Sequence, residues 1–451
     1  MQKKTFKRGI HPLRGIQGGK LPTRGLPIED YASDSVTIPM QMHIGAPATP
    51  CVKKGDHVKL GQVIGLANGF MSVPVHASVS GEVTAVGPIA YTGAAPVTAV
   101  SIRNDFLDTW EELHPLGSVE QADPARILPA IQAAGICGMG GAAFPTHVKL
   151  TFKEGMYCDI LIVNGAECET HLTADHRLML ENGVRIVDGL RAVMRALNVE
   201  NGVIAIEDNK PDAIAAMRRA ATGREGVRVQ PLKTKYPQGG EKQLIEALTG
   251  RQVPARKLPL DVHVVELNVA TCAAIADAVI DGRPLISRVT TVTGCVREPK
   301  NLRLRVGTLA EDAIGRCGGF SETPGKIFFG GAMTGVCLPG LDMPMTKATG
   351  GIVALNERDA ASQEEGPCIR CGRCVAACPI GLNPYRIKVA ADASDFAAAE
   401  KLHVNDCILC GSCAYMCPAR RWLTPSFNFA KDHLAAQARA AAAAKKGGAS
   451  Q

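Results

Sequence analysis

Two copies of one cysteine pattern near the C-terminus constrain this chain more than any other feature of its 451 residues. The segments CIRCGRCVAACP and CILCGSCAYMCP both read C-x2-C-x2-C-x3-C-P. Zinc takes four ligands and has no use for a third closely spaced cysteine, whereas three thiolates at this spacing wrap around one [4Fe–4S] cubane. The fourth cysteine, just before a proline, fills the open corner of the other cluster. We therefore expect two [4Fe–4S] clusters, with the ligand sets Cys368, Cys371, Cys374 and Cys417, and Cys407, Cys410, Cys413 and Cys378.

The remaining half of the 16 cysteines are scattered singly, and we expect them to be buried apolar thiols. The first 25 residues lack the apolar core of a secretory signal, and no stretch of about 18 apolar residues occurs. The sequence therefore predicts neither a signal peptide nor a membrane span. A chain without a signal stays in a reducing compartment, where clustered cysteines indicate metal rather than disulfides.

The charge of the chain is mildly basic and is concentrated at its N-terminus. The formal net charge is +7, which is too small to indicate nucleic acid as a partner. Residues 1–34 form a basic arm, whose first 25 residues carry lysines and arginines but no acid. We expect a solvated leader that packs on the next domain, with anionic lipid or an acidic partner as the alternatives.

The first folded region, residues 35–105, is rich in Val, Gly and Pro, with turn signals between short alternating runs. This pattern predicts small antiparallel β structure. The segment KKGDHVKLGQVI and a later run with SGEV are similar to the barrel-sandwich module of biotinyl and lipoyl carriers. Where such a carrier presents its modified lysine, this chain has Asn68-Gly69-Phe70-Met71, so we expect a structural module and not a carrier.

The rest of the chain divides by its hydrophobic pattern. Over 118–285 apolar runs alternate with segments of helical spacing, which predicts an α/β domain. Residues 286–345 return to strand-like runs and fit a small β-grasp-like domain. Residues 360–428 hold the cysteine segments and an Ala-rich connection, which predicts a helical two-cluster, ferredoxin-like domain, and 429–451 form an Ala-rich tail. The expected fold class is multidomain α/β + β.

A glycine-rich loop, GICGMGGAAFPTHVK, opens the α/β region. It follows a predicted helix instead of a strand, and Ala143 takes the third position of G-x-G-x-x-G, so a Rossmann dinucleotide fold is not indicated. The loop glycines let backbone amides approach a phosphate or a flat ring, and a lysine adds positive charge. These residues are Gly138, Gly140, Gly141 and Lys149. A plain glycine turn is the alternative.

Three further segments place polar groups at the ends of predicted strands or the starts of predicted helices. VNGAECE follows an apolar strand, whereas YPQGGEK and ELNVAT begin helices. Ligands of open α/β sheets lie off the carboxyl ends of the strands, so these groups are expected to converge with the glycine loop. The alternative is that each of these polar groups is a helix cap or a solvated acid, which requires no ligand. The residues concerned are Asn164, Glu167, Glu241, Asn268 and Thr271.

These segments, together with TADHR, resemble the flavin and NADH segments of the flavoprotein subunit of respiratory complex I. The order of the whole chain, from TFKRGIHP to the cysteine motifs, resembles the family of C subunits of bacterial Rnf/Rsx ion-translocating electron-transport complexes. The resemblance implies FMN and NADH sites, with a catalytic Glu241 near the nicotinamide. It implies FMN contacts from Gly138, Gly140, Lys149, Asn164, Asn268 and Thr271, and Gly141 and Glu167 are further cofactor-binding candidates.

The chain departs from the complex I pattern in three places. It has Gly240-Glu241 where complex I has two successive glutamates, and AECE in place of a DEGEP-like loop. It also carries two cysteine motifs, whereas the complex I flavoprotein carries one cluster. The charge near the flavin ring is therefore arranged differently.

The resemblance implies a peripheral electron-transfer subunit on the cytoplasmic side of a bacterial inner membrane, attached through its partners. It would move electrons between NADH, FMN and two [4Fe–4S] clusters, as an NADH-linked oxidoreductase subunit of a translocase. The other subunits are the expected partners and ferredoxin is a further candidate. Two alternatives stay open: a soluble flavin and iron–sulfur reductase of the cobalamin-reductase type, and a flavin-free iron–sulfur carrier that docks a ferredoxin.

Overall fold

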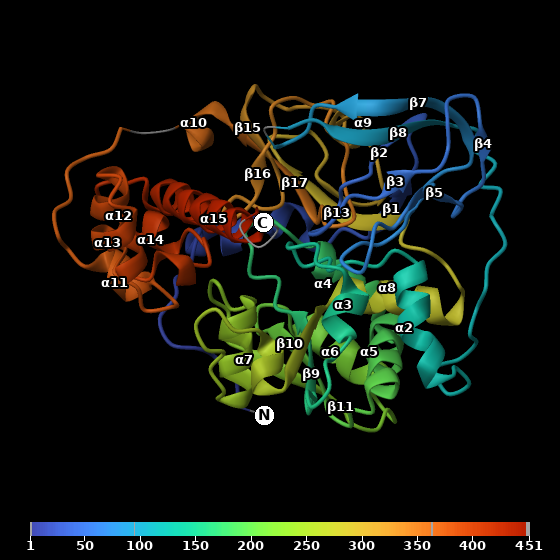
Figure 1. Ribbon diagram of the computed structural model, residues 1–451, viewed down its shortest axis with the longest axis horizontal. Helices are drawn as coiled ribbons and strands as arrows, with labels where there is room; N and C mark the ends of the chain where they lie inside the picture. Colours follow the sequence, from blue (N-terminus) through green and yellow to red (C-terminus); the bar gives the residue numbers. More distant parts are fainter. Residues whose placement is uncertain (1, 94, 362–363, 448–451) are drawn as a thin grey trace.

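Four β-sheets and a helical C-terminal region make up the computed structural model (Figure 1). The structure describes residues 2–93, 95–361 and 364–447. In Figure 1 the antiparallel and mixed sheets lie above, the parallel sheet with its helices lies below, and the cysteine-bearing helices lie at the left. The N-terminal segment runs between the parallel-sheet domain and those helices.

The first β domain consists of two small sheets around one core. One sheet has the antiparallel order β2-β8-β7-β4 and the other the order β3-β5-β6. Val36, Ile38 and Ile64 are fully buried in the shared core, as the alternating runs require. The tip between β5 and β6 carries an exposed Phe70 and no lysine. The strands are β2 (Ser35–Pro39), β3 (Thr49–Pro50), β4 (His57–Val58), β5 (Val63–Leu66), β6 (Val75–His76), β7 (Gly81–Ile89) and β8 (Val97–Asn104).

A parallel sheet with the order β11-β10-β9-β12 forms the centre of the second domain. Its strands are short apolar runs, because helices cover both faces. Since the strands are parallel, the loops after β9 and β12 open at one edge. The strands are β9 (Ile160–Gly165), β10 (Gly202–Glu207), β11 (Val227–Leu232) and β12 (Val264–Asn268). The helices are α2 (Pro124–Ala133), α3 (Thr146–Leu150), α4 (Ala174–Glu181), α5 (Gly183–Leu197), α6 (Pro211–Ala220), α7 (Glu241–Thr249) and α8 (Val269–Ile280), with the short η2 (Pro259–Val262).

Side chains cap the N-termini of two helices of this domain, and for one of them the sequence predicts the helix start. The Asp123 side chain caps α2 by accepting a hydrogen bond from the Ala125 N–H at 3.0 Å. The Asn268 side chain caps α8 by accepting from the Ala270 N–H at 2.8 Å. Each cap satisfies an amide that has no partner inside the helix and stabilises the helix by about 1 kcal/mol.

A six-stranded mixed sheet with the order β1-β14-β13-β17-β15-β16 forms the third domain. Its edge strand β1 comes from the N-terminal arm and pairs in parallel with β14. The sheet also includes β17, which lies beyond the predicted range 286–345. The strands are β1 (Ile28–Tyr31), β13 (Ser287–Gly294), β14 (Lys300–Arg305), β15 (Pro324–Phe329), β16 (Val336–Cys337) and β17 (Gly351–Asn356), and the helices are α9 (Ala310–Arg316) and α10 (Glu357–Ala360).

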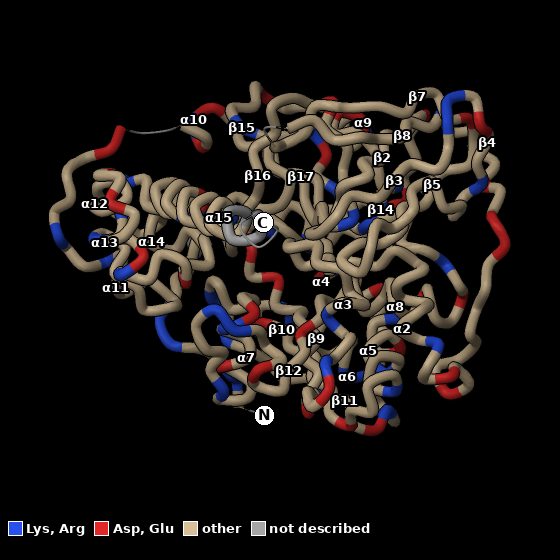
Figure 2. Tube along the Cα trace, in the orientation of Figure 1, with Lys and Arg blue, Asp and Glu red and all other residues tan. Residues whose placement is uncertain are grey.

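The basic arm is not the solvated leader that its charge predicts, and it does not pack on the next domain alone. Phe6 and Ile10 are buried, and Ile10 exchanges two backbone hydrogen bonds of 2.8 Å with Tyr236 of the α/β domain. The apolar residues among the basic ones fix the arm, because they bury surface against that domain. Figure 2 shows the basic residues on this segment where it passes between α7 and the cysteine-bearing helices. Two short helices follow, η1 (Arg14–Gly19) and α1 (Leu21–Arg24).

The C-terminal region consists of several short helices and one helix of 25 residues, α15, around a small core that includes Ile387, Val404 and Phe427. The Ala-rich tail is helical in its described part, because α15 extends to Gly447, and residues 448–451 lie outside the described residues. Within the described ranges, no helix is both long and apolar enough to cross a bilayer. The helices are α11 (Arg373–Ala377), α12 (Pro384–Asp392), α13 (Phe396–Lys401), η3 (Val404–Asp406), α14 (Ser412–Tyr415) and α15 (Leu423–Gly447).

Packing of α5 on α8 predicts a severe effect of one added methyl group. A Cβ atom on Gly189 would lie 1.8 Å from the Cys272 carbonyl oxygen, so Gly189→Ala must separate the two helices. We expect a loss of about 3 kcal/mol in the free energy of unfolding, measured by chemical denaturation. Gly315→Ala in α9 is the matched control, because no atom lies near its Cβ position. This control should be neutral or stabilise the protein by up to about 1 kcal/mol, and equal stability of both variants would contradict the packing.

Candidate functional site

A cavity of about 730 Å³ lies off the carboxyl edge of the parallel sheet. Loops of the α/β domain, the six-stranded sheet and the first β domain all contribute to its walls. Its volume is in the usual range for a cofactor site, roughly 300–1,000 Å³. All nine residues that the sequence singles out as catalytic or cofactor-binding line it: Gly138, Gly140, Gly141, Lys149, Asn164, Glu167, Glu241, Asn268 and Thr271.

The glycine loop packs on the N-terminus of α8. The Met139 N–H donates to Thr271 Oγ1 at 3.0 Å. A Cβ atom on Gly140 would lie 3.3 Å from the Asn268 Cβ, so a side chain there would crowd the helix start. Gly141 has a φ of +126°, a conformation that glycine adopts readily. Loop amides and the first turn of a 12-residue helix therefore border one part of the cavity, an arrangement that suits an anionic or polar group.

Lys149 lies between two carboxylates in the cavity wall. Its Nζ lies 3.2 Å from Glu241 Oε1 and 3.6 Å from Glu266 Oε2. Burial acts to lower the pKa of Lys149, but the charges of Glu266 and Glu241 outweigh it and raise that pKa above its usual value. Lys149 is therefore a fixed cation. Glu266 begins the segment ELNVAT but was not itself predicted as a site residue, because it lies inside the otherwise apolar strand β12.

The end of β9 brings Asn164 into the wall, and the loop after β9 brings Glu167. Asn164 Nδ2 donates to the Gly239 carbonyl oxygen at 2.8 Å, which ties this loop to the one before α7. Glu167 Oε1 accepts from the Asp175 N–H at 2.7 Å. Burial raises the pKa of Glu167 to about 7, against the opposing charge of Lys20. The cavity therefore holds a carboxyl group whose charge changes near neutral pH.

Several polar atoms of the cavity wall have no hydrogen-bond partner among the described residues. A buried polar atom without a partner costs roughly 1–3 kcal/mol, so a group of them beside a cavity is typical of a site that a ligand completes. Both donors and acceptors are present, which fits a flavin mononucleotide with its polar ring edge and phosphate. Arg288, from β13, has no sequence motif around it and was not predicted. The atoms are Thr146 Oγ1, Glu167 Oε2, Asp175 Oδ1, Arg288 Nε and Arg288 Nη1.

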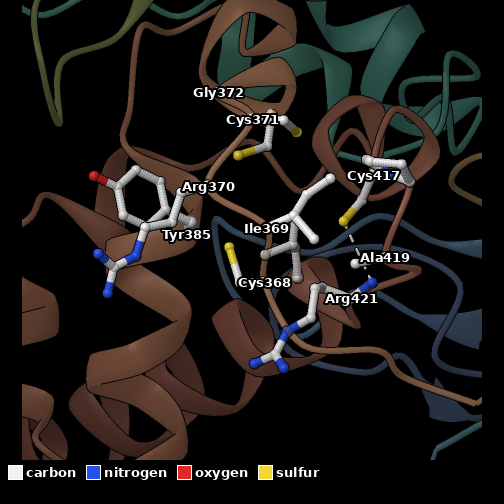
Figure 3. A pocket seen from close by; sticks show the side chains of 12 residues that line it. Cys368, Ile369, Arg370, Cys371, Gly372, Tyr385, Cys417, Ala419 and Arg421 are labelled. Atoms are coloured by element: carbon white, nitrogen blue, oxygen red, sulfur yellow. Dashed lines mark hydrogen bonds between the residues drawn. The ribbon is translucent and has the colours of Figure 1, made fainter.

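The structure brings the motif cysteines together in two sets of four. Each set combines three cysteines of one motif with the fourth cysteine of the other, as the spacing predicts. Figure 3 shows Cys368, Cys371 and Cys417 around one space, with Arg370 and Tyr385 at its edge. The outer set is Cys368, Cys371, Cys374 and Cys417, and the inner set is Cys378, Cys407, Cys410 and Cys413.

Neither cysteine set has the arrangement that a site for one metal ion requires. In the part of the chain that the structure describes, no three His, Cys, Asp or Glu side chains are placed to hold a single metal ion. A cubane spreads its four thiolates over four iron corners, so its ligands stand farther apart. The sets therefore fit [4Fe–4S] clusters by ligand number, ligand type and origin in the chain.

The two sets differ in exposure. Cys368 and Cys371 of the outer set are exposed, whereas Cys378 and Cys413 of the inner set are buried. Cys410 of the inner set lines the large cavity itself. The inner set is thus adjacent to the cavity and the outer set reaches the surface.

Tyr236 joins the cavity to the inner set. It lines the cavity, is buried, and its Oη donates to the Cys410 carbonyl oxygen at 2.8 Å. Burial raises the pKa of Tyr236, so the hydroxyl stays protonated and remains a donor. This residue was not predicted, because its partner lies far away in the sequence.

Comparison with protein families divides the chain into four regions. Residues 4–107 match the RnfC barrel sandwich hybrid domain, 131–277 the Nuo51 FMN-binding domain, 289–336 an SLBB domain and 360–420 a 4Fe-4S dicluster domain. A mixed α/β architecture with a barrel-sandwich, a flavin-binding and a dicluster domain is thereby confirmed. FMN and two [4Fe–4S] clusters are the cofactors that these domains fit.

The chain is similar to named proteins over most of its length. It is 46% identical over 401 residues to the C subunit of the proton-translocating ferredoxin:NAD(+) oxidoreductase complex of Clostridium ljungdahlii, covering 88% of this chain and 87% of that protein. It is 46% identical over 438 residues to the Na(+)-translocating counterpart of Acetobacterium woodii, covering 96% and 98%. It is 43% identical to the C subunit of the ion-translocating oxidoreductase complex of Rhodobacter capsulatus, covering 96% and 84%.

One solved structure shares the fold over part of the chain. It is an NAD+-reducing [NiFe]-hydrogenase in the H2-reduced state, with a TM-score of 0.50 and 20% identity. The match covers 68% of this chain and 62% of the hydrogenase chain, and it concerns the fold alone.

Each cysteine set is crossed, because it takes its fourth cysteine from the other motif. This arrangement predicts how much iron each double cysteine variant should lose. Cys378→Ser with Cys407→Ser removes two ligands of the inner set and should leave about four of about eight iron atoms per chain. Cys378→Ser with Cys368→Ser removes one ligand from each set and should deplete both clusters. Iron and acid-labile sulfide are measured after anaerobic reconstitution. An uncrossed arrangement would exchange the two results.

Proposed function

The chain belongs to the family of C subunits of ion-translocating oxidoreductase complexes, and from this premise we propose which of its residues carry out the electron transfer. It is a peripheral electron-transfer subunit of such a complex, which links NADH, FMN and two [4Fe–4S] clusters. One observation carries the assignment of residues. Nine candidates from four separate segments line one cavity, and that cavity also reaches Cys410 of the inner set.

The cavity residues are proposed to hold FMN and to receive NADH. When bound, FMN exchanges a hydride with NADH and single electrons with iron–sulfur clusters. Gly138, Gly140 and Gly141 present backbone amides beside the α8 N-terminus, where Asn268 and Thr271 complete the polar wall. These groups bind the cofactor without having to move protons.

Glu241 is the proposed catalytic residue on the nicotinamide side. It lies in the first turn of α7, and its carboxylate is held 3.2 Å from the Lys149 ammonium group. A carboxylate fixed by a cation can orient a polar substrate group with little loss of side-chain freedom. Asn164 at the end of β9 and Glu167 in the loop that follows complete the site.

The cysteine sets are proposed to hold one [4Fe–4S] cluster each. The spatial order is the cavity, the inner set and the outer set. Because Cys368 and Cys371 are exposed, the outer set is the one that a partner protein can approach.

The finer domain labels follow from the same premise. We propose a non-carrier barrel sandwich over 35–105, an FMN- and NADH-binding domain over 118–285 and a two-cluster ferredoxin-like domain over 360–428. The range 286–345, which contains the SLBB match, is the core of a β-grasp-like domain that the arm and β17 extend.

The protein is proposed to lie on the cytoplasmic side of a bacterial inner membrane, held by other subunits, with ferredoxin as a further partner. Two relatives of equal identity to this chain are named for different ions, protons and Na(+). The overall sequence identity of this chain to its relatives therefore does not indicate which ion a complex transports.

Anaerobic reconstitution with iron, sulfide and FMN, followed by NADH, tests the proposal. Both flavin and iron–sulfur absorption should be present, and NADH should bleach both. Glu241→Gln should lower kcat/KM for NADH about tenfold or more, a loss of about 1.4 kcal/mol, while iron and FMN contents stay unchanged. Glu246→Gln is the control on the same helix, because Glu246 bonds to Gln252 and lies outside the cavity.

The two alternative functions give different results in the same preparation. If the protein shows iron–sulfur absorption but binds no FMN, the flavin-free iron–sulfur carrier is the correct function. If FMN binds but NADH does not bleach its absorption, the proposed NADH site would be wrong and the proposed flavin site would stand. If the protein stays soluble when intact partner subunits are present, a cobalamin-reductase type of enzyme is favoured.

A further inference from the structure

Lys20 belongs to the N-terminal arm, but its side chain is buried beneath the loop that follows β9. It lies between η1 and α1 and is 8% exposed. Its Nζ donates to the carbonyl oxygens of Glu167, Glu169 and Leu172 at 2.9, 2.8 and 2.5 Å. It also lies 3.9 Å from Glu167 Oε2. Four oxygen atoms of one cavity loop therefore surround a single ammonium group.

The arm also holds the backbone of this loop. The His171 N–H donates to the Gly18 carbonyl oxygen at 2.8 Å, and Gly19 lies so close to the His171 ring that a Cβ atom would be 2.6 Å from it. Glu167 and His171 have φ values of +46° and +67°, which a residue with a side chain seldom adopts. Such conformations persist only where neighbours hold them, and here the neighbours include Gly18, Gly19 and Lys20.

Charged groups from several elements face the Glu167 carboxyl group, but Lys20 is the cation that forms an ion pair with it. Burial raises the pKa of Glu167 to about 7, and the charge of Lys20 opposes this rise more than any other group does. Burial in turn lowers the pKa of Lys20. The groups that face this pair are Asp175 from α4, Lys210 before α6, Glu207 from β10, Arg288 from β13, and Cys168, Glu169 and His171 from the loop itself.

We propose that Lys20 is a positioning residue of the flavin site, which holds the 167–172 loop in place and favours the ionised form of Glu167 beside the bound cofactor. The inference rests on the proposed function, because it needs FMN in the cavity that Glu167 lines. Reduction adds negative charge to a flavin, so an adjacent carboxylate disfavours the reduced form and a protonated carboxyl does not. The reduction potential of the bound flavin should therefore depend on the charge of Glu167.

The test is the pH dependence of the flavin midpoint potential in the reconstituted full-length protein, measured by anaerobic spectroelectrochemistry. The native protein should show an inflection near the Glu167 pKa of about 7. Lys20→Gln keeps a donor for the carbonyl oxygens but removes the charge, so the inflection should move to higher pH by about one unit or more, a tenfold change in ionisation. Lys20→Arg should restore it, and Glu167→Gln should abolish it.

Lys347→Met is the matched control. Lys347 is also a buried lysine bound to carbonyl oxygens, those of Pro74 and of Gly135, the first residue of the glycine-rich segment. Among the described residues, its hydrogen bonds do not involve the 167–172 loop. It should lose stability and keep the inflection.

An unchanged inflection in Lys20→Gln, or an equal shift in Lys347→Met, would overturn the proposal. If Lys20→Gln loses the flavin, recovery of flavin binding and of the inflection in Lys20→Arg supports the positioning role, and no recovery overturns it. Failure of the native protein to bind FMN would instead overturn the proposed function.

Discussion

Four basic side chains near the cavity can stay inside this protein because each of them has an acid within reach. Removing an ion from water costs several kcal/mol, and only a partner with good geometry offsets the cost. Two of these pairings, Lys20 with Glu167 and Arg288 with Asp175, join different regions of the chain, so the pairing and the arrangement of those regions depend on each other. The pairs are Lys20 with Glu167, Lys149 with Glu241 and Glu266, Lys210 with Glu207, and Arg288 with Asp175.

The features that could be predicted from sequence all have local signals. The cysteine spacing predicts crossed sets, because the geometry of a cubane determines which thiolates can share it. Asp123 and Asn268 mark helix starts, since a cap acts within three residues. The glycine loop and the strand-end polar groups were expected to converge, because a parallel sheet brings its carboxyl ends to one edge, and they line one cavity.

The features that could not be predicted depend on contacts between distant segments. Lys20 and Arg288 look like ordinary basic residues in a charged arm and in a strand. Only the fold places Arg288 at the cavity wall and Lys20 beneath the loop that forms part of that wall. The sequence of β1 does not identify the strand with which it pairs. The bond from Tyr236 to Cys410 likewise joins residues far apart in the chain. The exact limits of the domains and the ligand roles of individual residues remain predictions.

The pairing of β1 with β14 has a consequence for synthesis of the chain. The two strands are separated by about 270 residues, because Ile28 lies opposite Asn301. At roughly 5–20 residues per second, the first strand leaves the ribosome tens of seconds before its neighbour exists. A segment with many basic and few apolar residues can wait in water during that time without collapsing on itself. The basic composition of the N-terminus thus suits a segment that is made first and whose strand β1 finds its partner much later.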